Sequence, residues 1–419
     1  MWDPYAEFEM ATLPNGLTIH AAHWLGRPWE AMGFLIHSGA EHDTIGLEGT
    51  AHFVEHLISQ NADVPVKEAK DFFEGNGGKV NLGQTSYHFA RYQFWMPTDW
   101  AIFSRALQLF SKALLSAKLE KFVERERSVI IAEFNRKFTH RITYDLAMRE
   151  NRALYSGYWL ERFATPLGNP DSVGRITQDD LQAYYDAHYT PANMSIVGVG
   201  GLTLEELVRF VSESPFAVQK EGKRTQLPIP VTDITPPTEN RYVFELSKHL
   251  KTEVPFEVGG YRSVAVSPTG GRTMAVKMLS NMLDEVLTEE VRERRAVTYN
   301  IGTSYDYHRH FYEFVIECGR LEARALGDIE EVIEGCIGSI YDSIELFEKE
   351  KRCGLAAAFM IDPSAKGICE NAMNDLADKQ RISSLAEDAR DIENLTMDDI
   401  RGLLKWLKPE RRWTGITTP

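Results

Sequence analysis

The chain has 419 residues, of which 43% are hydrophobic and 26% charged, a composition typical of a globular protein with room for two or more domains. Its 46 Lys and Arg against 61 Asp and Glu give a formal charge of −15. This balance argues against a nucleic-acid partner, because binding phosphates requires clustered basic residues. It is compatible either with ordinary solubility or with attraction of cationic peptides.

The sequence shows no signal for export or for a membrane. The start, M-W-D-P-Y-A-E-F-E-M, lacks the basic and apolar regions of a signal peptide, and apolar stretches such as W-A-I-F-S-R-A-L-Q-L-F are interrupted by charge well short of membrane length. The cysteines are widely spaced and form no C-x-x-C pair: Cys318, Cys336, Cys353 and Cys369. We therefore expect a cytoplasmic protein with free thiols and no membrane contact.

The first half of the chain contains groups of strand-like and helix-like patterns, without strict β–α alternation. L-T-I-H-A-A-H-W and E-A-M-G-F-L-I-H-S predict strands, with a turn at the preceding L-P-N-G. Residues 47–60, 66–75 and 100–117 predict helices, and K-V-N-L-G-Q-T and Y-H-F-A-R-Y-Q-F-W-M predict a strand pair. No Pro or Gly interrupts the stretch from about Leu119 to about Leu154, so we expect one long helix there.

A proline-rich segment, residues 214–240, divides the chain into two nearly equal parts. Dense prolines disfavour helix and favour an extended linker. We therefore predict a first domain at 1–213 and a second at 241–419. The second part repeats this grouping, with expected strands near 241–247, 261–267, 297–305 and 310–317, a helix near 271–294, and further helices to the end.

The two parts end alike. Each has a Thr with an acid three residues later, Thr177 with Asp180 and Thr396 with Asp399, which is the pattern of a capping box. An amphipathic helix, a proline and a short apolar strand follow in both. This similarity indicates an internal duplication, with chance resemblance of two helix–strand units as the alternative. The predicted fold is α+β: two duplicated domains, each an antiparallel-rich mixed sheet with helices packed on one face.

One motif carries candidate chemistry. In T-A-H-F-V-E-H-L, His52 and His56 lie one helical turn apart on the same face, and Glu55 shares that face. Two imidazoles at this spacing can bind one Zn²⁺, with Zn–N bonds of about 2.0–2.1 Å. The arrangement H-x-x-E-H is the inverse of H-E-x-x-H. The alternative is an amphipathic helix with two partly buried histidines.

The predicted long helix supplies candidates for a third ligand. In F-V-E-R-E-R-S-V-I-I-A-E-F, Glu126 and Glu133 are seven residues apart and therefore share a face. One of them can bind the metal while the other orients a ligand. Taken alone, E-R-E-R is also what a solvated charged surface looks like.

H-F-V-E-H, followed much later by E-R-E-R-S-V-I-I-A-E, resembles the pitrilysin family of inverted-motif zinc peptidases, which includes insulin-degrading enzyme and mitochondrial processing peptidase. The chain is similar to a small two-domain, bacterial-type member. The resemblance implies that His52, His56 and Glu133 hold one zinc ion per chain. It also implies that Glu55 is the general base and that Glu126 supports the site from behind.

The resemblance extends over nearly the whole chain. G-G-K-V-N-L is similar to the edge strand of the family and places Asn81 in a substrate-binding position, while V-R-E-R-R-A-V-T-Y-N resembles the family's R-E-x-x-G-L-x-Y and gives Arg292 and Tyr299 catalytic roles. Without the resemblance, these two would be a helix-end arginine and a strand tyrosine. The chain departs from the family in reading N-L-G-Q-T-S instead of N-A-x-T-S, with Phe89 at a later family threonine, and Ala296 replaces a family glycine.

The function that the resemblance implies is zinc-dependent endopeptidase activity on short or unfolded peptides. The second half lacks H-x-x-E-H, so one catalytic site per chain is expected. Family members enclose peptides between four such domains, which implies a dimer, either of identical chains or with a paralogous subunit, in which Arg292 and Tyr299 reach the partner's zinc site. The alternative is a non-catalytic scaffold or partner subunit, which the family also contains.

Overall fold

The computed structural model describes residues 2–24, 26–60, 66–115, 117, 119–139, 141–225, 234–245, 258–268, 273–309, 311–322 and 325–418. Contacts divide the chain into two compact units. The first comprises Met1–Arg141, Phe163–Pro228 and Ile361–Ser384, and the second comprises Ile142–Arg162, Ile229–Met360 and Leu385–Pro419. Part of the expected linker, residues 226–233, and the ends of expected elements at 246–247, 271–272 and 310 lie outside the described residues.

A 6-stranded mixed sheet forms the centre of the first unit. Strand β2 runs parallel to β6, and all other neighbours are antiparallel. β4 forms one edge of the sheet, which leaves one side of its backbone unpaired within the sheet. In spatial order the strands are β1 (Phe8–Thr12), β2 (Thr18–His23), β6 (Met194–Gly200), β3 (Trp29–Ile36), β5 (Ala90–Pro97) and β4 (Lys79–Thr85).

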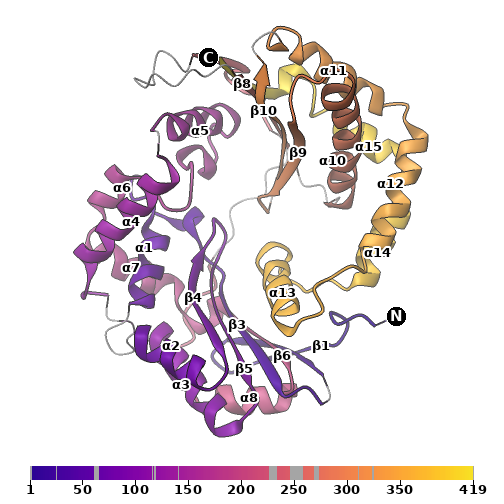
Figure 1. Ribbon diagram of the computed structural model, residues 1–419. Coiled ribbons are helices and arrows are strands. Elements are labelled where there is room, and N and C mark those ends of the chain that lie inside the picture. The colour runs from indigo at the N-terminus through magenta and orange to yellow at the C-terminus, as the bar shows by residue number, and fades with distance from the viewer. Residues whose placement is uncertain are drawn as a thin grey trace. The chain divides into compact units, whose positions relative to one another are not determined.

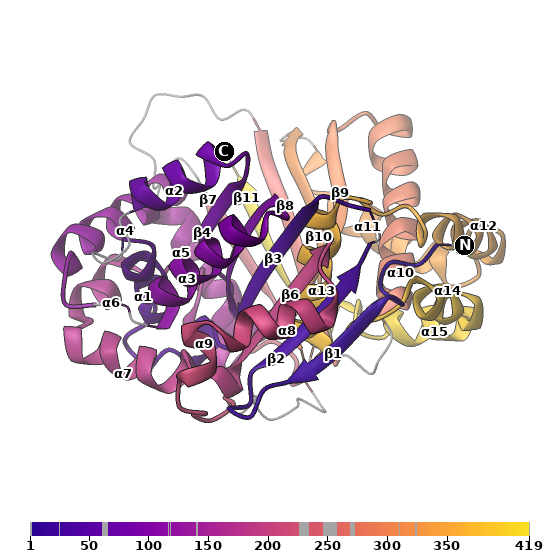
Figure 2. The same ribbon diagram turned by 90° about the horizontal axis from the view of Figure 1, so that it is seen from below.

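Most helices of this unit cover one face of the sheet and enclose an apolar core that contains Phe34, Phe94 and Phe110. Figure 2 shows α8 lying across the strands of this sheet. The helices are α1 (Thr50–Ser59), α2 (Val66–Gly75), α3 (Trp100–Leu115), α4 (Val123–Lys137), α6 (Pro170–Arg175), α7 (Gln178–His188), α8 (Leu204–Ser212) and α9 (Pro215–Val218), with 3₁₀ turns at Ala40–His42 and Pro191–Asn193.

A helix from the second half of the sequence covers the other face. Helix α13 (Ala365–Lys379) packs against β3 and β6, and Figure 1 shows it on the opposite side of the sheet from α2 and α3. The alternation of side chains along β3 explains the two faces, because Phe34 points into the core while Gly33 faces α13. A Cβ atom at Gly33 would lie 2.3 Å from Met373 Sδ, so the glycine permits the close packing of α13.

The second unit has a 5-stranded sheet in which, as in the first, one pair of strands is parallel and the others are antiparallel. β7 runs parallel to β11, and the other neighbours are antiparallel. In spatial order the strands are β7 (Arg241–Glu245), β11 (Arg412–Thr418), β8 (Val258–Pro268), β10 (Phe311–Glu322) and β9 (Asn300–Tyr307). The helices are α5 (Arg141–Leu154), α10 (Thr273–Leu287), α11 (Ile329–Ile340), α12 (Ile344–Ala357), α14 (Leu385–Asn394) and α15 (Met397–Leu404), with a π-helix at Thr288–Arg294 and 3₁₀ turns at Trp159–Arg162 and Pro409–Arg411.

Helix α5 lies on the face of this sheet that α10 does not cover. Arg262 of β8 donates to both carboxylate oxygens of Glu150, at 2.8 and 2.9 Å, and its neighbour Tyr261 points into the core on the opposite face. The ring of Tyr155, just after α5, lies 5.2 Å from that of Phe311. Each unit thus contains a helix from the other half of the sequence: α5, from the first half, belongs to the second unit, and α13, from the second half, belongs to the first.

The predicted fold class is confirmed, and α5 and α13 are additions to the predicted helical face. The order β2-β6-β3-β5-β4 in one sheet corresponds to β7-β11-β8-β10-β9 in the other, as a duplication requires. Both predicted capping boxes form: Asp180 Oδ2 accepts from Thr177 N at 2.8 Å, and Asp399 Oδ2 accepts from Thr396 N at 2.9 Å. Each capping box begins the helix before a strand that has a parallel neighbour. Helix α7 precedes β6, which is parallel to β2, and α15 precedes β11, which is parallel to β7.

The prediction of one long helix between Leu119 and Leu154 is wrong. The structure has two helices, because Phe138 leaves the helical conformation with φ −111° and ψ 64°. The helices on the two sides of the break pack in different units. Ile130 of α4 is buried in the core of the first unit, whereas Glu150 of α5 binds Arg262 in the sheet of the second unit. Tertiary packing therefore overrides a local sequence that contains no helix breaker.

Candidate metal centre

Helix α1 is placed by a cap from the preceding loop. Gly49, which precedes the first helical residue, has the left-handed φ of 103°. The carboxylate of Asp43 accepts from Gly49 N at 2.7 Å and from Ala51 N at 2.8 Å, which satisfies backbone donors that a helix start leaves free. Its negative charge also suits the positive end of the helix dipole. Asp43 therefore stabilises the start of α1 in two ways, by hydrogen bonds to its backbone and by its negative charge.

The imidazoles of His52 and His56 face each other on α1, with ring centroids 4.6 Å apart. The carboxylate of Glu133, from α4, reaches both of them: Oε2 lies 3.8 Å from His52 Nε2 and 3.5 Å from His56 Nε2. The structure thus brings together three side chains that the sequence analysis selected as metal ligands, from two helices far apart in the sequence.

Glu126 lies behind this group. Its Oε2 is 3.1 Å from His56 Nδ1, the ring nitrogen on the side away from Glu133, and its side chain is only 2% exposed. Arg127 of α4 donates to the carbonyl oxygens of Val173 in α6 and of Ile176 just after it, which ties α4 to α6. Glu126 and Glu133 therefore contact the same imidazole from opposite sides.

Glu55 is buried beside the histidines. Its Oε2 lies 3.9 Å from His52 Nε2, while Ser59 Oγ and Thr85 Oγ1 each lie 3.4 Å from one of its oxygens. Ligand atoms of His52, Glu55 and His56 all fall within 4.8 Å of one another, the one such group of three among the described residues. Three carboxylates thus approach the rings, and among the described residues only Glu133 lies within 4 Å of both Nε2 atoms.

Protonation in this group follows from burial and charge. Burial, together with the neighbouring His56, lowers the pKa of His52 to about 4, so its ring is neutral near pH 7. Burial opposes charge on His56 too, but the hydrogen bond to Glu133 and the charges around it raise its pKa. Hydrogen bonding to His56 lowers the pKa of Glu133, whereas burial raises the pKa of Glu55 to about 7. The pKa of Glu133 is therefore lowered and the pKa of Glu55 is raised, although both carboxylates lie beside the same two imidazoles.

The donor set fits zinc. Four ligands around zinc at bond lengths of about 2.0–2.1 Å are separated from one another by about 3.3 Å. The distances from Glu133 Oε2 to the two Nε2 atoms, 3.8 and 3.5 Å, are close to this value. Two imidazole nitrogens and one carboxylate oxygen, with the second ring nitrogen of His56 hydrogen-bonded to a carboxylate, form the usual environment of a catalytic zinc ion.

The remaining predicted residues lie in both units. Asn81 is on β4, and its Oδ1 accepts from Gly83 N at 3.3 Å. Arg292 and Tyr299 lie in the second unit, at the π-helix and just before β9, where the Arg292 guanidinium carbon lies 4.1 Å from the centre of the Tyr299 ring. The side chain of Tyr299 is 80% exposed. The structure therefore brings Arg292 and Tyr299 together as a pair on the surface of their unit.

The residues that surround Glu55 were not predicted from the sequence. Ser59 could have been found, because it lies four residues after Glu55 on α1 and so shares its face. Thr85 and Gly83 meet Glu55 from β4, a contact between distant segments with no signal in local periodicity. Asp43, which caps α1, lies seven residues before Thr50 and outside the usual capping spacing.

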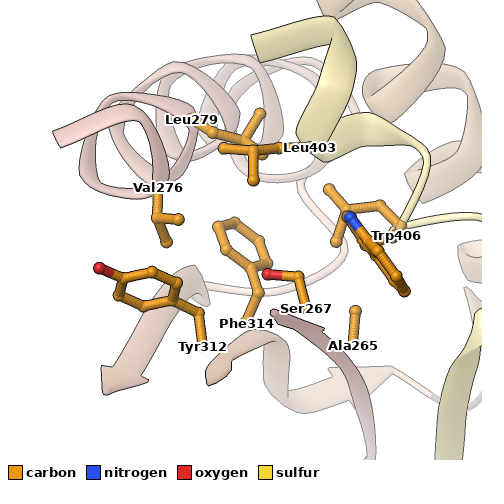
Figure 3. A pocket seen from close by; sticks show the side chains of 9 residues that line it. Ala265, Ser267, Val276, Leu279, Tyr312, Phe314, Leu403 and Trp406 are labelled. Atoms are coloured by element: carbon orange, nitrogen blue, oxygen red, sulfur yellow. The ribbon is translucent and has the colours of Figure 1, made fainter. Parts of the chain in front are cut away.

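An apolar pocket in the second unit has a different character (Figure 3). It lies between the sheet and helices α10 and α15, with Val276 and Phe314 among its walls, and its polar groups include the hydroxyls of Ser267 and Tyr312. The lining contains no carboxylate, imidazole or thiol. Its free volume of about 10 Å³ has room for little more than one water molecule, and it has none of the acid–base groups of the metal centre.

Comparison with known families agrees with this geometry. Residues 28–154 match the family described as Insulinase (Peptidase family M16), and residues 175–350 match the family described as Peptidase M16 inactive domain. The chain belongs to peptidase family M16, the pitrilysin family. The first match covers His52, His56 and Glu133, whereas the M16 match described as inactive covers most of the second half, which lacks the H-x-x-E-H motif.

Relatives in family M16 include a mitochondrial-processing peptidase subunit and an uncharacterised bacterial zinc protease. The chain is 30% identical over 210 residues to a probable mitochondrial-processing peptidase subunit beta of Arabidopsis thaliana, a match that covers 49% of this chain and 38% of that protein. It is 20% identical over 402 residues to an uncharacterised zinc protease of Bacillus subtilis, covering 93% of both. The chain thus aligns with less than half of the plant M16 protein but with nearly all of the bacterial one.

The M16 fold extends over the chain. The crystal structure of a protease from Helicobacter pylori matches with a TM-score of 0.82 at 18% identity, covering 98% of this chain and 99% of that one. Within the described ranges, no helix is long and apolar enough to cross a membrane. Membership of family M16 supports a zinc peptidase in general.

Proposed function

We propose that this protein is a zinc-dependent endopeptidase that hydrolyses short or unfolded peptides at the centre formed by α1 and α4. The observation that supports it best is the approach of Glu133 Oε2 to the Nε2 atoms of both His52 and His56, with Glu55 buried beside them. A zinc peptidase needs a metal with an open coordination position and a base next to it; His52, His56 and Glu133 could hold the metal, and Glu55 is placed to act as the base.

In this proposal His52, His56 and Glu133 hold one zinc ion per chain. When bound, zinc lowers the pKa of a water ligand from that of bulk water to about 7 and polarises a carbonyl oxygen. Glu55 accepts the proton of the attacking water and passes it to the leaving amine. Its burial suits this role, because a carboxylate with a raised pKa both takes up and returns a proton near neutral pH. Glu126 orients His56 through Nδ1.

The substrate would bind as an added strand. β4 is an edge of the first sheet and passes next to Glu55 through Thr85 and Gly83. An extended peptide pairing with the free side of β4 would lie alongside the metal centre, and its affinity would come mostly from backbone hydrogen bonds. Asn81 lies on this strand and would contact the peptide there. This mode favours unfolded peptides and tolerates many sequences.

Arg292 and Tyr299 would serve the same reaction from the second domain. Tyr299 donates to the oxyanion that forms at the attacked carbonyl, and Arg292 binds a carbonyl or carboxylate of the peptide. Their mutual contact at 4.1 Å holds the two side chains together, and the exposure of Tyr299 leaves its hydroxyl available.

We further propose a cytoplasmic dimer, of identical chains or with a paralogous subunit. Proteins of this family enclose peptides between four domains, so a chain with two would complete its chamber by pairing. In that dimer Arg292 and Tyr299 act on the partner's metal centre. The cytoplasmic location is supported by the cysteines, all of which are free thiols: Cys318, Cys336, Cys353 and Cys369.

A second function is a non-catalytic scaffold or partner subunit. It is favoured by the match of residues 175–350 to a domain described as inactive. It is opposed by the presence and the proximity of His52, Glu55, His56 and Glu133, which a scaffold does not require.

Replacing Glu55 by Gln separates the two functions. The variant should bind zinc as the wild type does, because Glu55 is not a ligand, yet lose cleavage of an unstructured fluorogenic peptide by at least about 100-fold. Zinc content by mass spectrometry and peptide cleavage are measured on the same preparations. A wild type that binds no zinc and cleaves no peptide, alone or with a paralogous partner, would establish the scaffold function.

A further inference from the structure

The edge strand β4 contains a bulge beside the candidate metal centre. Its pairing with β5 shifts by one residue between Asn81 and Gln84, so Leu82 and Gly83 together oppose one residue of β5. Two hydrogen bonds hold the bulge: Asn81 Oδ1 accepts from Gly83 N at 3.3 Å, and Leu82 O accepts from Ser59 Oγ at 2.7 Å. The bulge is thus tied to the C-terminal part of α1, one turn after Glu55.

The backbone of Gly83 lies against the carboxylate of Glu55. A Cβ atom at Gly83 would lie 2.2 Å from Glu55 Oε1 and 2.6 Å from its Cδ. Carbon and oxygen atoms cannot approach so closely without overlap, so any side chain at position 83 and the present position of the Glu55 carboxylate exclude each other.

The backbone conformation does not explain the glycine. Gly83 is not among the residues with positive φ, unlike Gly49 at the start of α1. A β-bulge often needs glycine for a left-handed residue, but here an alanine could adopt the same backbone angles. What requires a glycine at position 83 is the space occupied by Glu55.

Hydrogen bonds to Glu55 are too long to fix its position alone. Ser59 Oγ and Thr85 Oγ1 each lie 3.4 Å from the carboxylate, at the outer limit of a hydrogen bond. The carboxylate is nevertheless buried. Its position therefore depends on steric contact as well, and the backbone at Gly83 lies so close that an added Cβ would overlap Oε1.

We propose that Gly83 is a positioning residue for Glu55: the glycine in the bulge lets β4 approach and sets where the base carboxylate stands relative to His52 and His56. This inference rests on the proposed function, in which Glu55 is the base. A side chain at position 83 would push the carboxylate away from the attacked carbonyl without touching a metal ligand.

Gly83→Ala tests the inference, with Gly302→Ala as the matched control. Gly302 lies on β9, the edge strand of the second sheet, and its added Cβ would meet Asp284 Oδ1 at an ordinary 3.6 Å. Gly83→Ala should keep its zinc and its KM for an unstructured peptide but lose about 10- to 100-fold in kcat, the usual effect of misplacing a catalytic group by about 1 Å. Gly302→Ala should match the wild type in all three.

A double-mutant cycle with Glu55→Ala distinguishes positioning from a general disturbance of β4. Alanine lacks the Oε1, Cδ and Cγ atoms that a Cβ at position 83 would meet, so it leaves room for a methyl group. Gly83→Ala should therefore lower the Tm of the wild type by more than it lowers the Tm of Glu55→Ala, because the two changes act through one contact. An equal shift of Tm in both backgrounds would overturn the inference.

Crystal structures of the wild type and Gly83→Ala test the inference without any activity. The Glu55 carboxylate should move by about 1 Å or more in Gly83→Ala, while β4 and both imidazoles stay in place. A carboxylate that stays in place overturns the inference even if the wild type is an active peptidase. A wild type without peptidase activity refutes the proposed function, and the position of the carboxylate then still decides whether Gly83 places it.

Discussion

Glu126 Oε2 lies 3.1 Å from Nδ1 of His56, in a side chain that is only 2% exposed. This contact occupies Nδ1, and the other ring nitrogen, Nε2, faces Glu133 at 3.5 Å. A hydrogen bond at one ring nitrogen fixes which nitrogen can bind a metal. In the proposed zinc centre, Nε2 would therefore be the atom of His56 that binds the metal.

Glu126→Gln should weaken zinc binding by about 10- to 100-fold, because an amide accepts from Nδ1 without the negative charge that makes Nε2 more basic. The dissociation constant is measured by competition with a chromophoric chelator. Glu124→Gln is the control: it removes the same charge from the same helix at a side chain that is 82% exposed. If both variants bind zinc equally well, Glu126 does not support the site.

Removing the metal should destabilise the unit that carries it. A ligand that binds only the folded state contributes about 4 kcal/mol to the free energy of unfolding when present at 1,000 times its Kd. Calorimetry with zinc and with a chelator should therefore show a zinc-dependent rise in Tm for the wild type and for Glu55→Gln, and none for His52→Ala. A rise in His52→Ala equal to that of the wild type would place the zinc elsewhere.

Gly49→Ala should disturb the start of α1 more than Gly46→Ala does. Both glycines have positive φ, 103° and 87°, so an alanine at either costs about 1–3 kcal/mol in backbone strain. At Gly49 the new Cβ would also lie 2.6 Å from Leu167 O, whereas at Gly46 it meets no atom within 4 Å. Urea denaturation should show the larger loss for Gly49→Ala, together with weaker zinc binding. Equal losses would mean that the clash with Leu167 is relieved without cost.

Glu313 should make the second unit less stable as the pH rises. Burial, reinforced by the charge of Glu150, raises the pKa of Glu313 to about 7, against Tyr155, which donates to it, and Arg262, 3.7 Å away. A folded-state pKa above the unfolded value of 4.5 means that the folded state holds the proton longer, so stability falls between pH 4.5 and pH 7.

Glu313→Gln removes this titration and keeps an acceptor for Tyr155. From pH 5 to pH 8 the free energy of unfolding of the wild type should fall by about 2–3 kcal/mol relative to the variant, as a shift of that size predicts. Urea denaturation at several pH values measures the difference. A constant difference across this range would show that Glu313 keeps an ordinary pKa in the fold.

Mixing two inactive variants tests whether Tyr299 acts on the partner's centre. If it does, Glu55→Gln and Tyr299→Phe chains that exchange freely form mixed dimers with one intact site, and the mixture recovers about a quarter of wild-type activity. Activity is compared before and after subunit exchange, with each variant alone as control. Activity that stays at the sum of the two separate variants would show that each chain uses its own Tyr299 or that the dimer does not form.

The features that local spacing controls could be predicted from the sequence. The interval between His52 and His56 places both rings on one face of a helix of any fold, and the Thr–Asp pairs at both capping boxes form as predicted. The meeting of Glu133 with these rings followed from the resemblance to a family, since no periodicity links α1 to α4. The structure brings these side chains together, and their roles in catalysis stay predictions.

Features that depend on which distant surfaces meet could not be predicted. Helices α5 and α13 look like ordinary amphipathic helices, and nothing in their periodicity indicates that each packs on the sheet of the other half. The same holds for Gly83: the residue breaks the family pattern of the edge strand, but its contact with Glu55 appears only when β4 and α1 are placed together.

The zinc content of the purified protein tests the central claim most directly. After dialysis against a buffer of fixed free zinc, the wild type and Glu55→Gln should each retain one zinc ion per chain, as should the control Glu124→Gln, whereas His52→Ala, His56→Ala and Glu133→Gln should each lose most of it. A wild type that retains no zinc, or a Glu133→Gln variant that retains as much as the wild type, would contradict the account.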